Sequence, residues 1–121
     1  MEALEYKHQQ AVIKWTQQSN VRQKWPELAM LYHIKNETPS GGSRQVAIDK
    51  AMGVKKGVPD LCLPVSRGQY HGLYIEMKKP GGKVANAQRW WLEHLAGQEY
   101  MAVCCYGYQE AISTIERYMS L

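Results

Sequence analysis

Apolar and polar residues alternate along this chain with two periods, one typical of helices and one typical of strands. From residue 2 to residue 19, apolar side chains recur at helical spacing, which predicts an amphipathic helix. Trp25-Pro26 interrupts that pattern, because a proline lacks the amide hydrogen that a helix interior uses. The compact apolar segment from Leu28 to Ile34 then predicts the first strand.

The rest of the chain switches repeatedly between the two periods. Apolar segments predict strands over residues 60–63, 73–77 and 100–106, and amphipathic segments predict helices over residues 43–52, 87–95 and 109–119. The polar stretch between the first two of these strands contains two glycines, so it predicts a hairpin connection. Helices before, between and after several short strands are typical of an α/β layer structure.

The composition is that of an ordinary folded domain. The 121 residues are 45% hydrophobic and 21% charged, so we expect a single domain over residues 1–121. No apolar run approaches the roughly 20 residues that cross a bilayer, and the acidic N-terminus lacks a secretory signal. We therefore expect a cytoplasmic protein without a membrane partner, with its three cysteines as free thiols.

Two carboxylates and a lysine lie at the ends of two predicted neighbouring strands. Asp60 opens one strand after a Val-Pro pair, Glu76 lies near the end of the next, and Lys78 follows two residues later. Glu76 and Lys78 share a face because side chains alternate along a strand, and a hairpin would bring Asp60 within reach. Mg²⁺ takes oxygen ligands, commonly one or two carboxylates together with phosphate and water. The motif therefore predicts that a divalent cation and Lys78 meet at one phosphate.

Positive charge gathers around this motif. The net charge is +4, and residues 55–89 include seven basic residues against two acids, which are Asp60 and Glu76 themselves. Basic side chains attract a polyanion while the carboxylates hold a cation, so we expect a nucleic acid as the partner. The lysines expected to contact the substrate backbone are Lys55, Lys56, Lys79 and Lys83.

The spacing of these residues resembles the signature of the PD-(D/E)xK phosphodiesterases. The surrounding residues resemble more narrowly the virus-type replication–repair nuclease family, known as the VRR-NUC domain. A Gly-Val pair precedes the Pro-Asp of the motif, and a helix with the pattern Gln-x-x-Trp follows it. The similar stretches are distributed over nearly the whole chain, at residues 26–28, 33–37, 57–61, 72–78 and 88–92.

This resemblance implies a restriction-endonuclease-like α/β fold, with a small central mixed β-sheet flanked by helices. It also implies cleavage of DNA that depends on Mg²⁺ or Mn²⁺. Asp60 and Glu76 match the metal-ligand positions of the family, Met77 the position that supplies a carbonyl ligand, and Lys78 the catalytic lysine.

Three further positions are expected near the motif. The family carries a glutamate on its first helix, and Glu5 matches best because it lies at the edge of the apolar stripe, while Glu2 is the alternative. Gln88, near the start of its helix, is expected to reach the site and orient the lysine or a phosphate. Glu37 stands where many relatives have glycine, so we expect it near the metal at most and not essential to the chemistry.

The resemblance implies a structure-specific endonuclease of phage or prophage type, acting on branched DNA such as four-way junctions or flaps. Symmetric binding of two junction arms predicts a homodimer. Two alternatives stay open, namely a catalytically weak DNA-binding module and a sequence-specific restriction endonuclease, although the short chain leaves little room for a recognition insertion. A histidine base is not expected, because neither His33 nor His71 has a metal-ligand spacing.

Overall fold

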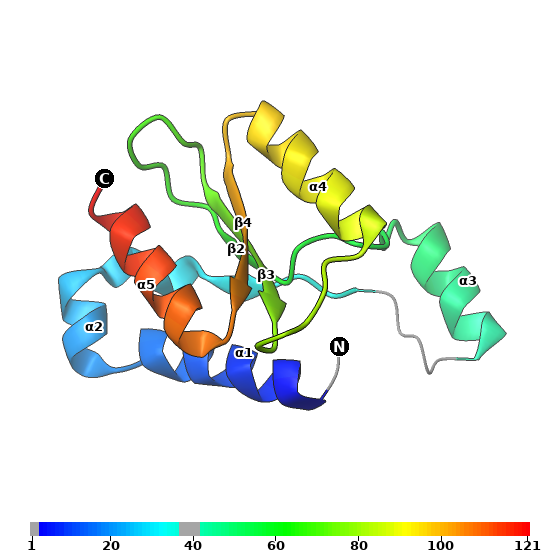
Figure 1. Cartoon of the computed structure of the whole chain (residues 1–121), viewed down its shortest axis with the longest axis horizontal. Coiled ribbons are helices and arrows are strands. Elements are labelled where there is room, and N and C mark those ends of the chain that lie inside the picture. The colour runs from blue at the N-terminus through cyan, green and yellow to red at the C-terminus, as the bar shows by residue number, and fades with distance from the viewer. Residues whose placement is uncertain (1–2, 37–41) are drawn as a thin grey trace.

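The computed structural model describes residues 3–36 and 42–121, which build a four-stranded mixed sheet with helices on both sides (Figure 1). The strands are β1 (Tyr32–His33), β2 (Leu61–Leu63), β3 (Leu73–Lys78) and β4 (Met101–Tyr106). They lie in the order β1-β2-β3-β4; β2 is antiparallel to β1 and β3, and β4 is parallel to β3. The predicted α/β fold with a small mixed sheet is confirmed.

The helices surround this sheet unequally. They are α1 (Ala3–Thr16), α2 (Ser19–Lys24), the 3₁₀ helix η1 (Pro26–Met30), α3 (Ser43–Ala51), α4 (Asn86–Gly97) and α5 (Tyr108–Met119). α1 packs against α5 and β3, while α4 packs against β4. In Figure 1, α4 and α5 lie on opposite sides of the sheet and α3 projects away from it. None of the described helices is long and apolar enough to cross a bilayer.

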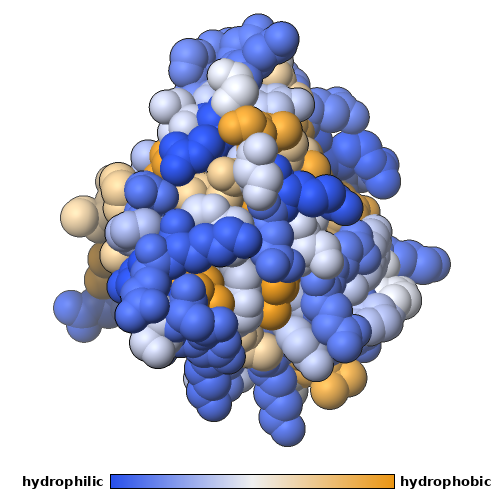
Figure 2. Space-filling model, turned by 90° about the vertical axis from the view of Figure 1, so that its left-hand side faces the viewer, coloured by the Kyte–Doolittle hydropathy of each residue, from blue (hydrophilic) through white to orange (hydrophobic). Residues whose placement is uncertain are grey.

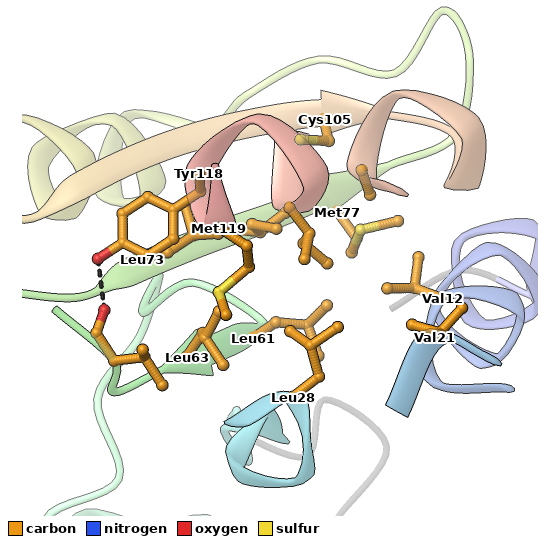
Figure 3. Close-up of a cluster of buried hydrophobic side chains, with 14 residues drawn as sticks. Val12, Val21, Leu28, Leu61, Leu63, Leu73, Met77, Cys105, Tyr118 and Met119 are labelled. Atoms are coloured by element: carbon orange, nitrogen blue, oxygen red, sulfur yellow. Dashed lines mark hydrogen bonds between the residues drawn. The ribbon is translucent and has the colours of Figure 1, made fainter. Parts of the chain in front are cut away.

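One face of the sheet forms the core. Alternate residues of β2 and β3, such as Leu61, Ile75 and Met77, are fully buried there, because every second side chain of a strand points to the same face. Figure 3 shows how side chains from α1, α2, η1 and α5 close over them. The surface over α2 and α5 is mostly hydrophilic, with scattered apolar side chains (Figure 2), as expected where water meets a folded domain.

Tyr118 fastens α5 to this core. Its ring is fully buried, and its hydroxyl donates a hydrogen bond of 2.5 Å to the Val65 carbonyl (Figure 3). Val65 belongs to the connection between β2 and β3. One buried polar contact therefore joins the last helix to the middle of the chain.

The structure differs from the sequence-based prediction over the first 34 residues. The helix predicted for residues 2–19 ends at Thr16, whose hydroxyl donates to the Ile13 carbonyl at 2.6 Å and whose own carbonyl accepts from Arg22 Nε at 3.1 Å. Side-chain bonds of this kind compete with continuation of a helix. α2 then begins as a separate helix.

The strand predicted for Leu28 to Ile34 is wrong over most of its length. Pro26 opens the 3₁₀ helix η1 there, since proline is favourable in a first helical turn, where its missing amide is not needed. Leu28 is buried from this helix, and extended pairing is limited to Tyr32–His33. The three cysteines are free, as predicted.

Removing the Tyr118 hydroxyl tests its role. Tyr118→Phe keeps the ring and leaves the buried Val65 carbonyl without its donor. We expect the free energy of unfolding to fall by about 1–3 kcal/mol, measured by urea denaturation. The same substitution at the exposed Tyr6 should change stability little. Equal stability of the wild-type protein and Tyr118→Phe would contradict this assignment.

Candidate active site

The pairing of β2 with β3 places Asp60 beside Glu76. Leu61 pairs with Ile75, and these are the residues next to Asp60 and Glu76 in the sequence. The Met77 N–H donates to Asp60 Oδ2 at 2.7 Å. Lys78 Nζ lies 3.9 Å from Glu76 Oε2. The exposed fractions of Asp60, Glu76 and Lys78 are 3%, 3% and 8%. The three motif residues thus come together in a buried group, on the face of the sheet opposite Met77.

Asp60 is also held by the segment that includes and follows β1. Its carbonyl accepts from the Ile34 N–H at 2.8 Å and from His33 Nδ1 at 2.9 Å. Asn36 Nδ2 donates to Asp60 Oδ1 at 3.3 Å. The sequence pattern predicted no role for His33 or Asn36. Both lie in the stretch 33–37 that resembles the family, but only the β1–β2 pairing reveals that they contact Asp60.

Glu76 is approached from the other side by α4. Gln88 Nε2 donates to Glu76 Oε2 at 3.2 Å, while Gln88 Oε1 accepts from the Ala85 N–H at 2.8 Å. The second contact caps the first turn of α4 and orients the Gln88 side chain. Gln88 therefore reaches the site, as predicted, although it contacts the carboxylate rather than the lysine. Glu76 Oε1 is buried and has no hydrogen-bond partner.

The environment of Glu76 favours its protonated form. Burial raises the pKa of the Glu76 carboxyl from 4.5 to about 9, and the neighbouring charge of Asp60 contributes in the same direction. The charge of Glu5 also raises this pKa, whereas Lys78 lowers it. At neutral pH the protonated form of Glu76 is therefore favoured in the metal-free protein.

The oxygen atoms at this point suit a hard divalent cation. A cation would provide the missing partner for Glu76 Oε1 and would displace the proton, because carboxylates bind metal in their ionised form. Among residues 3–36 and 42–121, no three His, Cys, Asp or Glu side chains are gathered closely enough to hold an ion by themselves. Two carboxylates completed by carbonyl, water and phosphate oxygens are a common arrangement for Mg²⁺.

Glu5 lies near this pair without joining it. It is 8% exposed on α1, the helix that packs against β3, and its charge reaches Glu76. Its role as a ligand stays a prediction. Glu2 and Glu37 lie outside the described residues.

Lys55 and Lys56 lie exposed on the connection between α3 and β2. The Trp91 indole N–H donates to the Lys56 carbonyl at 3.1 Å, which ties this connection to α4. Gly57 follows with φ of +86°, and a Cβ atom there would come within 2.7 Å of the Ala87 backbone. The connection therefore packs directly on the first turn of α4, the turn that carries Gln88.

Lys79 and Lys83 lie on the connection from β3 to α4. Lys83 is exposed and Lys79 is partly buried, and the Gly82 N–H donates to the Lys79 carbonyl at 2.9 Å, closing a turn. The predicted phosphate contacts are thus divided between two connections, one leading to Asp60 and one leaving Lys78.

The sequence model of the VRR-NUC domain family matches residues 3–109. The chain belongs to the VRR-NUC family. A solved structure of a "VRR_NUC domain protein" is 34% identical in sequence, with a TM-score of 0.81 and an alignment that covers 100% of this chain and 92% of that chain. A search of the curated proteins found no match. VRR-NUC membership implies a nuclease of the PD-(D/E)xK type, which acts on DNA and generally uses a divalent metal.

The raised pKa of Glu76 predicts how stability depends on pH. The folded protein keeps this proton up to about pH 9, whereas the unfolded chain loses it near pH 4.5, so rising pH between these values favours unfolding. Glutamine cannot lose a proton, so in EDTA Glu76→Gln should remove this dependence of stability on pH. At pH 8 it should raise the free energy of unfolding by at least about 1 kcal/mol. The gain should shrink toward pH 5. Chemical denaturation at several pH values measures both effects.

Glu93→Gln supplies the matched control, because Glu93 is an exposed carboxylate on α4. It should leave the pH dependence of stability as in the wild-type protein. Parallel stability curves for Glu76→Gln and wild type would show that the folded state does not retain the proton.

Proposed function

We propose that this VRR-NUC protein is a structure-specific endonuclease that hydrolyses phosphodiester bonds in branched DNA with Mg²⁺ or Mn²⁺. The observation that carries the proposal is the buried Glu76 Oε1, which has no partner and lies beside a second buried carboxylate and Lys78. Burying two carboxylates together is costly in any fold. A cation bound between the two carboxylates would offset that cost and make the arrangement useful for catalysis.

The residues assigned to the cation are those that converge on this point. Asp60 and Glu76 would hold it through their carboxylates, with the Met77 carbonyl and Glu5 as further ligands. Asp60 is already oriented by the Met77 N–H, so little side-chain freedom remains to be lost on binding. When bound, the ion supplies a Lewis acid for the phosphate and lowers the pKa of a water molecule.

Lys78 and Gln88 act around that centre. Lys78 is buried on β3, and its Nζ lies 3.9 Å from Glu76 Oε2, so it can donate to the oxygens of a phosphate placed at Glu76. There it offsets the negative charge that builds up as the attacking oxygen arrives. Gln88 keeps Glu76 Oε2 occupied, which leaves Oε1 as the free ligand atom.

The preference for branched DNA rests on where the basic residues lie. Lys55 and Lys56 precede Asp60 on one connection, and Lys79 and Lys83 follow Lys78 on another. Two separate basic segments are suited to two backbone segments that meet at a branch. The β2–β3 connection spans only residues 64–72, which leaves no insertion there for reading a base sequence in the major groove.

Lys78→Ala tests the proposal. The wild-type protein should cleave four-way junctions or flaps faster than linear duplex when Mg²⁺ or Mn²⁺ is present. The variant should lose about 100-fold or more in rate while its affinity for the same DNA in EDTA stays within about threefold. Gel assays measure cleavage, fluorescence anisotropy measures binding, and Lys14→Ala on the exposed part of α1 serves as the control. Failure of the wild type to cleave any of these substrates at high enzyme excess would refute the proposal.

We further propose that two copies act together on the two arms of a branch. α3 is nine residues long and projects from the sheet (Figure 1), and Ile48 and Met52, one turn apart, are 45% and 79% exposed. Asp49 is the buried residue of this helix. A short helix with so little burial is marginal alone, so contact with a second copy would stabilise it.

The double substitution Ile48→Glu and Met52→Glu should convert the dimer to a monomer, because it places charges in the apolar contact. Light scattering after size-exclusion chromatography measures the mass. Lys50→Glu on the same helix should leave the dimer largely intact. A wild-type protein that is monomeric at all concentrations tested would exclude this arrangement.

A further inference from the structure

Tyrosine side chains extend the face of the sheet that carries the acidic pair. Tyr32 of β1 pairs with Cys62 of β2, which in turn pairs with Tyr74 of β3. Paired residues of neighbouring strands project to the same face. Cys62 lies two residues after Asp60 and Tyr74 two residues before Glu76, so this row shares the face of the two carboxylates.

Tyr32 lies exposed beside a buried residue. It pairs directly with Cys62 across the two strands. Cys62 is 4% exposed, whereas Tyr32 is 50% exposed. About half of the tyrosine surface therefore faces water, next to a buried position of the sheet.

Tyr74 flanks Cys62 on the other side of this row. Its ring packs edge-on against Tyr100, with centroids 5.3 Å apart and an interplanar angle of 79°. Tyr100 in turn contacts His71, with centroids 5.8 Å apart. Ring contacts thus continue from Tyr74 of this row to Tyr100 and His71.

Single exposed aromatic residues are common on protein surfaces and often have no function. Tyr32 differs in its place beside the acidic pair. Tyr32 is on the strand next to β2 and pairs with the residue two positions after Asp60. Strand geometry then separates the backbone positions of Tyr32 and Asp60 by about 8 Å. That is close enough for a nucleotide whose neighbouring phosphate lies at Asp60 and Glu76 to meet the ring.

Trp90 is the competing candidate for contact with bases. It is 52% exposed and stacks on His94 of the same helix, with centroids 3.9 Å apart. However, Gln88 points to Glu76, and two residues along a helix rotate a side chain by about 200°. Trp90 therefore faces away from the acidic pair.

The chemistry of base stacking decides which DNA suits Tyr32. In a duplex, both faces of each base are covered by its neighbours, so an aromatic side chain has no face to stack on. An unpaired base offers that face, and stacking on an aromatic ring is tolerant of sequence.

We propose that Tyr32, exposed on the sheet face that carries Asp60 and Glu76, is a stacking platform for an unpaired base, so that the DNA this protein cleaves has an unpaired nucleotide next to the scissile phosphate. This rests on the proposed nuclease function and specifies its substrate. Tyr32 acts as a specificity-determining residue and takes no part in bond cleavage.

Two substitutions at the same position isolate the ring. Tyr32→Phe and Tyr32→Leu both remove the hydroxyl, and only the second removes the aromatic face. In EDTA, Tyr32→Leu should bind a short dT strand about fivefold or more weakly than wild type, with unchanged affinity for a duplex of matched length. Tyr32→Phe should stay within about twofold for both. Anisotropy measures affinity, and thermal melts confirm that both variants are folded.

Cleavage then links the platform to the reaction. With Mn²⁺, Tyr32→Leu should lose the preference for flaps over fully paired DNA, while Tyr32→Phe keeps it. Equal binding of the dT strand by the leucine variant and wild type, or loss of that binding in Trp90→Leu instead, would overturn the proposal. If wild type cleaves no DNA but the ring still determines dT binding, the nuclease proposal fails and the platform stands. If wild type cleaves but both Tyr32 variants behave like it, the platform alone fails.

Discussion

Two carboxyl groups buried side by side at the end of β2 and β3 constrain the rest of this structure. Each loses its hydration and repels the other when both are ionised. The surrounding chain offsets this through donors to Asp60 and Glu76, namely the Met77 N–H, Asn36 and Gln88. One oxygen is still left without a partner, and a proton or a cation is what can complete it.

The donors to this pair come from elements that are far apart in the chain. The segment after β1 supplies one, β3 another and the first turn of α4 a third, while α1 adds the charge of Glu5. The mixed sheet makes this convergence possible, because its antiparallel half presents the ends of β2 and β3 together. The parallel crossover through α4 then returns a helix to the same place. The fold of the VRR-NUC family thus brings separate segments of the chain to the same two carboxylates.

Local rules account for the part of the site that could be predicted from sequence. Alternation along a strand places Glu76 and Lys78 on one face, and a short hairpin connection brings Asp60 to them. The contacts of His33 and Asn36 could not be found this way, because the pairing of β1 with β2 joins residues separated by α3 and its connections. The strand predicted from Leu28 onward was wrong for a different reason. A short apolar run is compatible with a strand or a helix, and the preceding Pro26 decided in favour of η1.

Gly53 and Gly57 differ in how far they should tolerate substitution, although their φ angles are +91° and +86°. A Cβ atom added at Gly53 would have no atom within 4 Å, whereas at Gly57 the backbone of Ala87 fills that space. Asparagine, which adopts positive φ more readily than most residues, should therefore be accepted at the first position and rejected at the second. A reporter group attached at residue 53 would sit beside the basic connection without disturbing it, which makes this glycine a practical place to observe DNA arriving.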